Sequence, residues 1–265
     1  MTDSALDDLR QRLRELDRVV VAFSGGADSA FLAWVAHDTL GPARASAVTA
    51  VSPSLAPEEE ADCAALASEW ALHWSTVATD ELADPAYVAN DGQRCYHCKA
   101  TLLDALAPIA SRQGAVVALG VNVDDLGDHR PGQHAAAERG AIFPLVDAGF
   151  TKAAVREVSR SLGLRTWDKP AAACLASRVP YGTPVTFHVL REVAVAESGL
   201  RALGFRQLRV RHYGELARVE LAADELRTAV ECREEVTAAV KAAGYRYVTL
   251  DLEGFRSGNL NDSLA

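Results

Sequence analysis

The sequence contains no apolar run that reaches the length of a membrane span, which is about 18 residues. Its beginning, MTDSALDDLRQRLREL, lacks the apolar core of a signal peptide. Cysteine is also scarce, since five cysteines in 265 residues are too few and too scattered for a disulfide framework. These absences exclude a membrane protein and a disulfide-stabilised secreted domain, and they predict a cytoplasmic globular protein.

Positive charge is in short supply as well. The 27 Lys and Arg residues are outnumbered by 36 Asp and Glu residues, which gives a formal net charge of −9. A protein that binds nucleic acid non-specifically needs a cationic face from which counterions are released. The composition therefore predicts no nucleic-acid partner and no membrane partner, although it leaves room for a local basic pocket.

The sequence does contain enough apolar residues, 49%, to form a packed core, and they occur in a regular order. Apolar runs typical of buried parallel strands cover residues 19–23, 45–51, 73–77 and 115–120. Segments with helical spacing cover residues 4–16, 28–40, 57–71, 99–112 and 151–163. This alternation predicts an α/β fold with an open parallel sheet and helices on both faces.

The pattern changes after about residue 170. Residues 168–186 are rich in Pro, Gly, Ala, Ser and Thr, which is typical of a connecting loop. Beyond this loop we expect helices at 188–203 and 223–243 and strands at 206–213, 216–221 and 245–251. The sequence thus predicts an N-terminal domain of residues 1–170 and a smaller C-terminal α+β domain of residues 171–265.

The most informative motif, SGGADS, lies between a predicted strand and a predicted helix. Gly25 and Gly26 let the backbone approach an anion, and the helix start directs unpaired N–H groups at it. Ser24 and Ser29 add hydroxyl donors. Asp28 is unexpected beside a phosphate unless Mg²⁺ lies between them, so the motif predicts a metal-bridged nucleotide. The alternative is a plain glycine turn with a serine cap.

This phosphate loop (residues 24–29) lacks the lysine that the P-loop of kinases and GTPases requires. It resembles instead the PP-loop of ATP pyrophosphatases, a superfamily that includes NAD synthetase, GMP synthetase and the tRNA thiolases. The resemblance implies a sheet of the adenine nucleotide alpha hydrolase-like type and cleavage of ATP between its α and β phosphates. The loop would hold pyrophosphate while a substrate oxygen attacks the α phosphorus.

Further motifs narrow the resemblance: RCYHCK at 94–99, NVDDLGDHRPGQHAAAE at 122–138 and ACLASRVPYG at 173–182. Together with RVR at 209–211 and YVTLDLEGFRSGN at 247–259, they resemble the LarE family of ATP-dependent sulfur transferases. This family makes the nickel-pincer nucleotide cofactor of lactate racemase. Its members adenylate a carboxylate of pyridinium-3,5-dicarboxylate mononucleotide and replace the activated oxygen with sulfur. The resemblance covers nearly the whole chain and implies ATP and Mg²⁺ as cofactors.

The same resemblance implies two possible sources of sulfur. In one subtype a single cysteine, in the position of Cys174, donates its own sulfur and becomes dehydroalanine. In another, three cysteines hold a 4Fe-4S cluster whose open iron carries an extra sulfide. The Cys95 and Cys98 pair plus the distant Cys174 suits such a cluster, which we favour. The alternatives are the sacrificial Cys174, a zinc site completed by His97 or water, and ordinary helix-entry cysteines at 95 and 98.

The substrate's phosphate and carboxylates require cations. Arg209 and Arg211 lie two apart on a predicted strand, so both side chains share one face and can bind an anion between them. We expect Arg256 to join them. The alternative is a solvated strand face on which Glu220 and Asp251 are the partners of the arginines.

The remaining site predictions concern loops. We expect Gly120 and Asp125 to contact ATP, because they follow a predicted strand and the carboxyl ends of parallel strands line the ligand crevice. Asp125, Asp128 and Arg130 are expected near ATP, Mg²⁺ or a subunit contact, with a structural ion pair as the alternative. Arg178 lies beside the cysteine loop, where it can steady the adenylate or the substrate phosphate.

We therefore assign catalytic roles to Asp28, Cys174 and Arg178. Cys63 and Cys232 fall inside predicted helices, where small buried cysteines without chemistry are typical.

Other functions remain as alternatives. A tRNA-thiolating PP-loop enzyme also uses a Cys-x-x-Cys pair plus a distant cysteine, but the chain is acidic and lacks a basic, aromatic-interleaved tract. An amide-forming synthetase would need a glutaminase domain, for which 265 residues leave no room. The intact phosphate loop argues against a non-enzymatic nucleotide-binding protein. Members of the LarE family form symmetric oligomers, so a homo-oligomer is expected, with a hexamer as one candidate.

Overall fold

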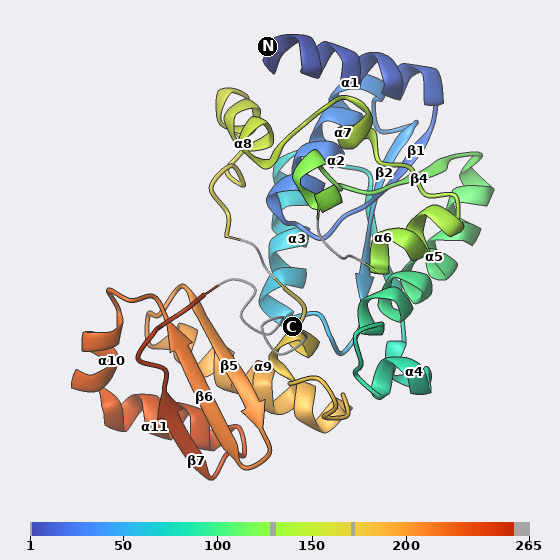
Figure 1. Ribbon diagram of the computed structural model, residues 1–265. Coiled ribbons are helices and arrows are strands. Elements are labelled where there is room, and N and C mark those ends of the chain that lie inside the picture. Colours follow the sequence, from blue (N-terminus) through green and yellow to red (C-terminus); the bar gives the residue numbers. More distant parts are fainter. Residues whose placement is uncertain (1, 128–130, 171–172, 257–265) are drawn as a thin grey trace. The chain divides into compact units, whose positions relative to one another are not determined.

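The computed structural model describes residues 2–127, 131–170 and 173–256 (Figure 1). The chain divides into two compact units, each made of several stretches of sequence. The first unit comprises Met1–Ser52, Pro57–Glu81 and Cys95–Ala172. The second comprises Pro53–Ala56, Leu82–Arg94 and Ala173–Ala265. Within the described ranges, no helix combines the length and the hydropathy that a membrane crossing requires.

The first unit contains a four-stranded sheet whose strands all run parallel. The strands are β1 (Val19–Ala22), β2 (Ala45–Val51), β3 (Trp74–Ala78) and β4 (Val116–Ala118), in the order β3-β2-β1-β4. From β1 the chain proceeds outward to β2 and β3, and it later adds β4 on the other side of β1. The sheet therefore reverses its direction of winding between β1 and β4, where ligands of such sheets bind at the carboxyl ends of the strands.

Helices cover both faces of this sheet. They are α1 (Thr2–Leu16), α2 (Ala27–Leu40), α3 (Pro57–Glu69), α5 (Arg94–Gln113), α6 (Pro131–Glu138), α7 (Pro144–Asp147) and α8 (Lys152–Ser161). Successive side chains of a strand point to opposite faces. Accordingly, Val19 and Val21 pack in a cluster with residues of α1, α2 and α8, whereas Val20 packs in a separate cluster with residues of α5. The valine run of β1 is apolar throughout because both of its faces are buried.

The second unit contains a smaller mixed sheet in the order β5-β6-β7, in which β5 and β6 are antiparallel and β6 and β7 are parallel. Its elements are η1 (Glu81–Ala83), α4 (Pro85–Val88), η3 (Leu175–Arg178), α9 (Phe187–Ala202), β5 (Leu208–Tyr213), β6 (Leu216–Leu221), α10 (Leu226–Glu231), α11 (Arg233–Ala242) and β7 (Tyr247–Leu250). One core forms from Val210 and Val219 of the sheet and from Leu200 and Val240 of the helices. The predicted α/β fold with a smaller α+β part is confirmed.

Some elements differ from the predictions. The helix expected at 223–243 is two helices, separated at Cys232, whose φ of −102° and ψ of 36° are not helical. The apolar positions Ala229, Val236 and Val240 keep helical spacing across this break, so the sequence pattern does not reveal it. The helix expected from residue 99 begins at Arg94 instead, which places the Cys-x-x-Cys pair inside its first two turns.

The second unit also includes two short segments from the loops that follow β2 and β3, which the predicted boundary near residue 170 does not anticipate. Backbone hydrogen bonds attach both segments: Leu175 N–H donates to the Ser54 carbonyl at 2.9 Å, and Val185 N–H donates to the Val88 carbonyl at 2.9 Å. The buried side-chain amide of Asn90 donates to carbonyls of the segment 179–183. These are pairings between distant positions, which local patterns cannot predict.

Candidate functional site

The phosphate loop leaves β1 at its carboxyl end, beside the point where the sheet reverses its winding. Ser29 closes the loop: its hydroxyl accepts from Ser24 N–H at 3.2 Å, lies 2.9 Å from the Ser24 hydroxyl and is 3.2 Å from the Gly26 carbonyl. Gly26 is the N-cap residue of α2, and the first N–H groups of a helix have no partner within it. The loop therefore presents free backbone donors and the positive end of α2, as an anion site requires.

Two glycines make this loop possible for different reasons. Gly25 has a φ of +69°, and a Cβ atom there would lie 2.9 Å from the Cys63 sulfur, so both its backbone conformation and its close packing favour glycine. Gly120 lies beyond β4, and a Cβ atom there would lie 2.7 Å from the backbone nitrogen of Ser29. Its contact is with the backbone of α2, so Gly120 lets β4 approach the phosphate loop. Direct contact of Gly120 with ATP stays a prediction.

Two carboxylates, those of Asp28 and Asp125, lie at the same end of the sheet as the phosphate loop. The pKa of Asp28 is raised, mainly by burial and next by the negative charge of Asp125, while Lys152 and Asn122 oppose the shift. Asp125 is buried, its carboxylate lies 3.0 Å from the Lys152 ammonium, and it accepts from Asn122 N–H at 3.2 Å. Two carboxylates that repel each other beside an anion site form a suitable donor set for Mg²⁺, which binds one or two carboxylates plus substrate phosphates.

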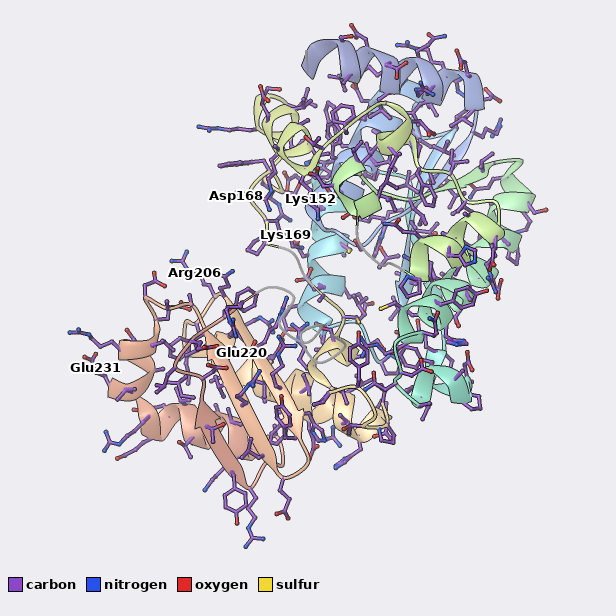
Figure 2. All side chains as sticks on the ribbon, viewed as in Figure 1. Lys152, Asp168, Lys169, Arg206, Glu220 and Glu231 are labelled. Atoms are coloured by element: carbon purple, nitrogen blue, oxygen red, sulfur yellow. The ribbon has the colours of Figure 1, made fainter. Side chains whose placement is uncertain are left out.

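Sequence reasoning missed three side chains of this site: Asn122 and Lys152 near the carboxylates, and Lys169 beside the loop. Asn122 stands in the motif that carried the family resemblance, so a signal for it existed. Lys152 begins α8 and Lys169 follows that helix in the chain (Figure 2). Neither has a local signal, because only the fold brings them to the end of β1. Asp128 and Arg130 lie outside the described residues.

The Cys-x-x-Cys pair lies in the first unit, within the first two turns of α5. Cys95 is exposed and Cys98 half-buried, and their spacing places them on one side of the helix. Cys174 is exposed and belongs to the second unit. Among residues 2–127, 131–170 and 173–256, no three His, Cys, Asp or Glu side chains are grouped to hold a metal ion. The cluster ligands therefore stay a prediction. Cys63 is fully buried, as expected.

Guanidinium groups hold the loop that carries Cys174. Arg178 donates to the carbonyl of residue 173 at 2.7 Å and to that of Cys174 at 3.2 Å. Arg94 donates to the Ala176 carbonyl at 2.9 Å, and Arg211 donates to the Ser177 carbonyl at 2.8 Å. Because every one of these bonds goes to a backbone carbonyl, the path of the loop is fixed while the Cys174 side chain stays exposed.

Arg178 has a buried carboxylate partner. Its guanidinium donates two hydrogen bonds to Glu197, at 2.8 and 3.1 Å, and Glu197 is fully buried. Glu197 also accepts from Arg201 at 3.1 Å and from Val210 N–H at 3.0 Å. These contacts make Arg178 a support for the cysteine loop, and the catalytic role expected for it stays a prediction.

Arg209 and Arg211 are both buried, with 6% and 1% of their surface exposed, so the alternative of a solvated strand face is wrong. Arg211 has a full partner, since Glu220 accepts from it twice at 3.0 Å. Arg209 stacks on Phe255, with its guanidinium carbon 4.5 Å from the ring centroid. Burial, with the nearby charges of Arg178 and Arg211, lowers the pKa of Arg209 to about 10.

In the part of the chain that the structure describes, no carboxylate lies within ion-pair distance of Arg209. A buried cation without a counter-ion is costly unless an anion binds it, so Arg209 is the candidate anion ligand of the second unit. Asp251 pairs with Arg218 at 3.4 Å, not with Arg209 or Arg211. The exposed Arg256 side chain pairs with Glu253 at 2.5 Å, and its contribution to substrate binding stays a prediction.

Substitutions of Arg209 and Arg211 are expected to have different effects on the stability of the fold. Arg211→Met removes the guanidinium that donates two hydrogen bonds to the buried Glu220, and we expect a loss of about 3 kcal/mol in the free energy of unfolding. Arg209→Met removes a buried charge that has no ion-pair partner among the residues that the structure describes, so we expect unchanged or increased stability. Urea unfolding of both variants measures the difference. Equal destabilisation by both substitutions would show that Arg209 is neutralised in the folded protein.

Comparisons with known proteins agree with this geometry. Residues 2–93 match the NAD synthase family model. An uncharacterised protein of Synechocystis sp. is 47% identical over 264 residues, which are 98% of each chain. Pyridinium-3,5-bisthiocarboxylic acid mononucleotide synthase of Lactiplantibacillus plantarum is 38% identical over 253 residues, covering 95% of this chain and 92% of that enzyme. An uncharacterised protein of Methanocaldococcus jannaschii is 25% identical and covers 95% of both chains.

The NAD synthase match includes β1 and the phosphate loop, so it supports the interpretation of that loop as a PP-loop. The match to the Lactiplantibacillus plantarum enzyme extends over both units and confirms the resemblance inferred from the motifs. At 38% identity over 95% of its length, the chain belongs to the LarE family, and it is an ATP-using enzyme of the PP-loop type.

Proposed function

We propose that this protein adenylates a carboxylate of pyridinium-3,5-dicarboxylate mononucleotide and converts it to a thiocarboxylate, as a step in nickel-pincer cofactor synthesis. The observation that carries the proposal is the match over 95% of the chain to an enzyme named for the corresponding dithio product. The phosphate loop supports the ATP-dependent half of this reaction. Arg209 is buried and has no ion-pair partner within the described ranges, which supports the binding of an anionic substrate.

Adenylation is needed because a carboxylate carbon is electron-rich and its oxygen is a poor leaving group. In the proposed reaction the N–H groups at the start of α2 hold the β and γ phosphates of ATP. A carboxylate oxygen of the substrate attacks the α phosphorus, and pyrophosphate leaves with the electron pair of the broken P–O bond. Asp28 and Asp125 would hold Mg²⁺, which neutralises charge on the phosphates. Arg209 binds the phosphate or a carboxylate of the substrate.

Two routes deliver the sulfur. In the sacrificial route the Cys174 thiolate attacks the adenylated carbon and displaces AMP, which gives a thioester. Loss of the Cys174 α proton and cleavage of its Cβ–S bond then release the thiocarboxylate and leave dehydroalanine. In the other route Cys95, Cys98 and Cys174 would hold a 4Fe-4S cluster that supplies a bound sulfide. We favour the cluster because the pair on α5 is spaced to place two ligands on one side of the helix.

The reaction is tested by incubating the purified protein with ATP, Mg²⁺ and the dicarboxylate nucleotide. We expect AMP and pyrophosphate in equal amounts and a product in which sulfur replaces one carboxylate oxygen, identified by mass spectrometry. The contradicting result is pyrophosphate release and sulfur incorporation with tRNA but not with the dicarboxylate nucleotide. That result would favour the tRNA-thiolating alternative.

The sulfur source is tested by anaerobic purification with iron and sulfide assays. The cluster predicts roughly four irons per chain, lost in Cys95→Ala and Cys98→Ala. Cys232→Ala is the matched control, because this half-buried cysteine lies at the junction of α10 and α11. A colourless protein that loses the mass of one H₂S during turnover would establish the sacrificial route instead. The expected homo-oligomer is checked by light scattering of the same preparation.

A further inference from the structure

Lys169 forms ion pairs beside the phosphate loop. The proposed reaction assigns no role to this lysine. Lys169 is labelled in Figure 2, and its side chain is 17% exposed. The ammonium donates to the Gly25 carbonyl at 3.1 Å, to Glu59 at 2.8 Å and to Asp62 at 2.7 Å. A lysine ammonium has three donors, and these three acceptors use all of them. In this arrangement the Lys169 ammonium binds only protein acceptors, because it has no donor left for a phosphate.

The backbone of Lys169 is also fixed. Its N–H donates to the Thr166 carbonyl at 3.1 Å, and its own carbonyl accepts from Arg156 at 3.1 Å. Burial disfavours the charged ammonium, but the hydrogen bonds that it donates to Asp62 and Glu59 outweigh burial and raise the pKa of Lys169. The lysine is therefore a fixed, charged group.

The contact with the Gly25 carbonyl determines how the phosphate loop faces its ligand. In a trans peptide the C=O and the following N–H point in opposite directions, and the described chain contains no cis peptide bond. With its carbonyl held toward Lys169, the peptide that joins Gly25 to Gly26 directs the Gly26 N–H away from Lys169. Gly25 has a φ of +69° and no Cβ atom, so this peptide needs an external contact to keep one orientation.

The charges around the loop give Lys169 a second effect. Glu59 and Asp62 lie on α3, and each is within 3 Å of the Lys169 ammonium, which itself contacts the loop. Without this cation, two carboxylates would face a site that binds the phosphates of ATP, and like charges repel. Lys169 therefore offsets the negative charge of Glu59 and Asp62 beside the phosphate loop.

We infer that Lys169 is a positioning residue of the ATP site: it fixes the Gly25–Gly26 peptide so that its N–H faces the phosphates, and it screens them from Glu59 and Asp62. The inference rests on the proposed function only through the binding of MgATP. It assigns no contact with the dicarboxylate nucleotide and no step of sulfur transfer.

The test is titration of the full-length protein with MgATP by calorimetry. We expect Lys169→Met to weaken MgATP binding by about tenfold or more, and Lys169→Arg to restore most of it. Arg165→Met is the matched control, because Arg165 also pairs with Asp62, at 2.7 Å, and with Glu69, at 2.8 Å, without a bond to the loop. We expect Arg165→Met to bind MgATP within about twofold of the wild type.

A second variant separates positioning from folding. Lys169→Met removes the cation shared by Glu59 and Asp62 and leaves Asp62 with Arg165, so the combination with Glu59→Gln and Asp62→Asn removes the lysine and both carboxylate charges together. This triple variant still lacks the donor to the Gly25 carbonyl, and we expect it to bind MgATP more weakly than Glu59→Gln with Asp62→Asn alone. Equal binding by these two variants, or by Lys169→Met and Arg165→Met, would overturn the inference. A wild-type protein that does not bind MgATP would instead contradict the proposed function.

Discussion

Replacing Cys174 by alanine is expected to abolish formation of the thiocarboxylate while pyrophosphate release from ATP continues. Both proposed routes need the Cys174 thiol, either as the sulfur donor or as a cluster ligand. The residues proposed to hold ATP and Mg²⁺ belong to the first unit, whereas Cys174 belongs to the second. Mass spectrometry of the nucleotide product and an assay of pyrophosphate measure the two halves of the reaction separately.

The fold should tolerate this substitution. The loop is held through backbone carbonyls, including that of residue 174 itself, and alanine keeps all of these acceptors. The Cys174 side chain is exposed, so its removal leaves no cavity. Cys232→Ala again serves as the control and should leave product formation unchanged. Thiocarboxylate produced by Cys174→Ala would contradict both routes and would require a sulfur donor outside the two proposed sites.

Asp28→Asn is expected to lower the rate of pyrophosphate release by about 1000-fold. Asparagine has nearly the same shape but lacks the negative charge that a Mg²⁺ ligand beside the phosphate loop must carry. Asp38→Asn is a matched control on the same helix: Asp38 is partly exposed and pairs with Arg10 at 2.6 Å. A surface ion pair of this kind contributes little, so the control should stay within about twofold of the wild type. Equal rates for the two variants would exclude Asp28 from the reaction.

The raised pKa of Asp28 adds a pH dependence. Only the ionised carboxylate binds Mg²⁺, so kcat/KM for ATP should rise as the pH passes upward through the pKa of Asp28. Asp125→Asn removes the neighbouring negative charge that helps to raise this pKa. The variant will be slower, but its acid limb should lie at lower pH than that of the wild type. An acid limb that stays in place would show that Asp28 does not determine it.

Much of the fold and part of the site could be predicted because their signals are local. The valine run of β1, the two glycines of the phosphate loop and the helix that follows are adjacent in sequence, and each imposes its own backbone geometry. Parallel strands alternating with helices then leave few topologies. The phosphate loop was located for the same reason: its chemistry resides in consecutive residues that need no distant partner.

The arginines show where this reasoning stops. Arg209 and Arg211 have the same residue type, strand and predicted face, and the sequence treats them as a pair. Glu220 is the cross-strand partner of Arg209, yet it accepts two hydrogen bonds from Arg211, while Arg209 stacks on Phe255 and has no ion-pair partner among the described residues. Which arginine stabilises the protein and which is available to an anion depends on partners contributed by other elements.

By itself, the sequence determined the α/β class, the phosphate loop and the family, because these follow from short-range patterns and from motifs of consecutive residues. Only the tertiary structure decided that Lys169 contacts the Gly25 carbonyl, that Asp28 and Asp125 repel each other, and that the side chains of two distant arginines donate hydrogen bonds to backbone carbonyls of the Cys174 loop. The physical reason is common to all three. Electrostatic and hydrogen-bonding energies depend on distances of a few ångströms between atoms, and separation along the chain does not encode those distances.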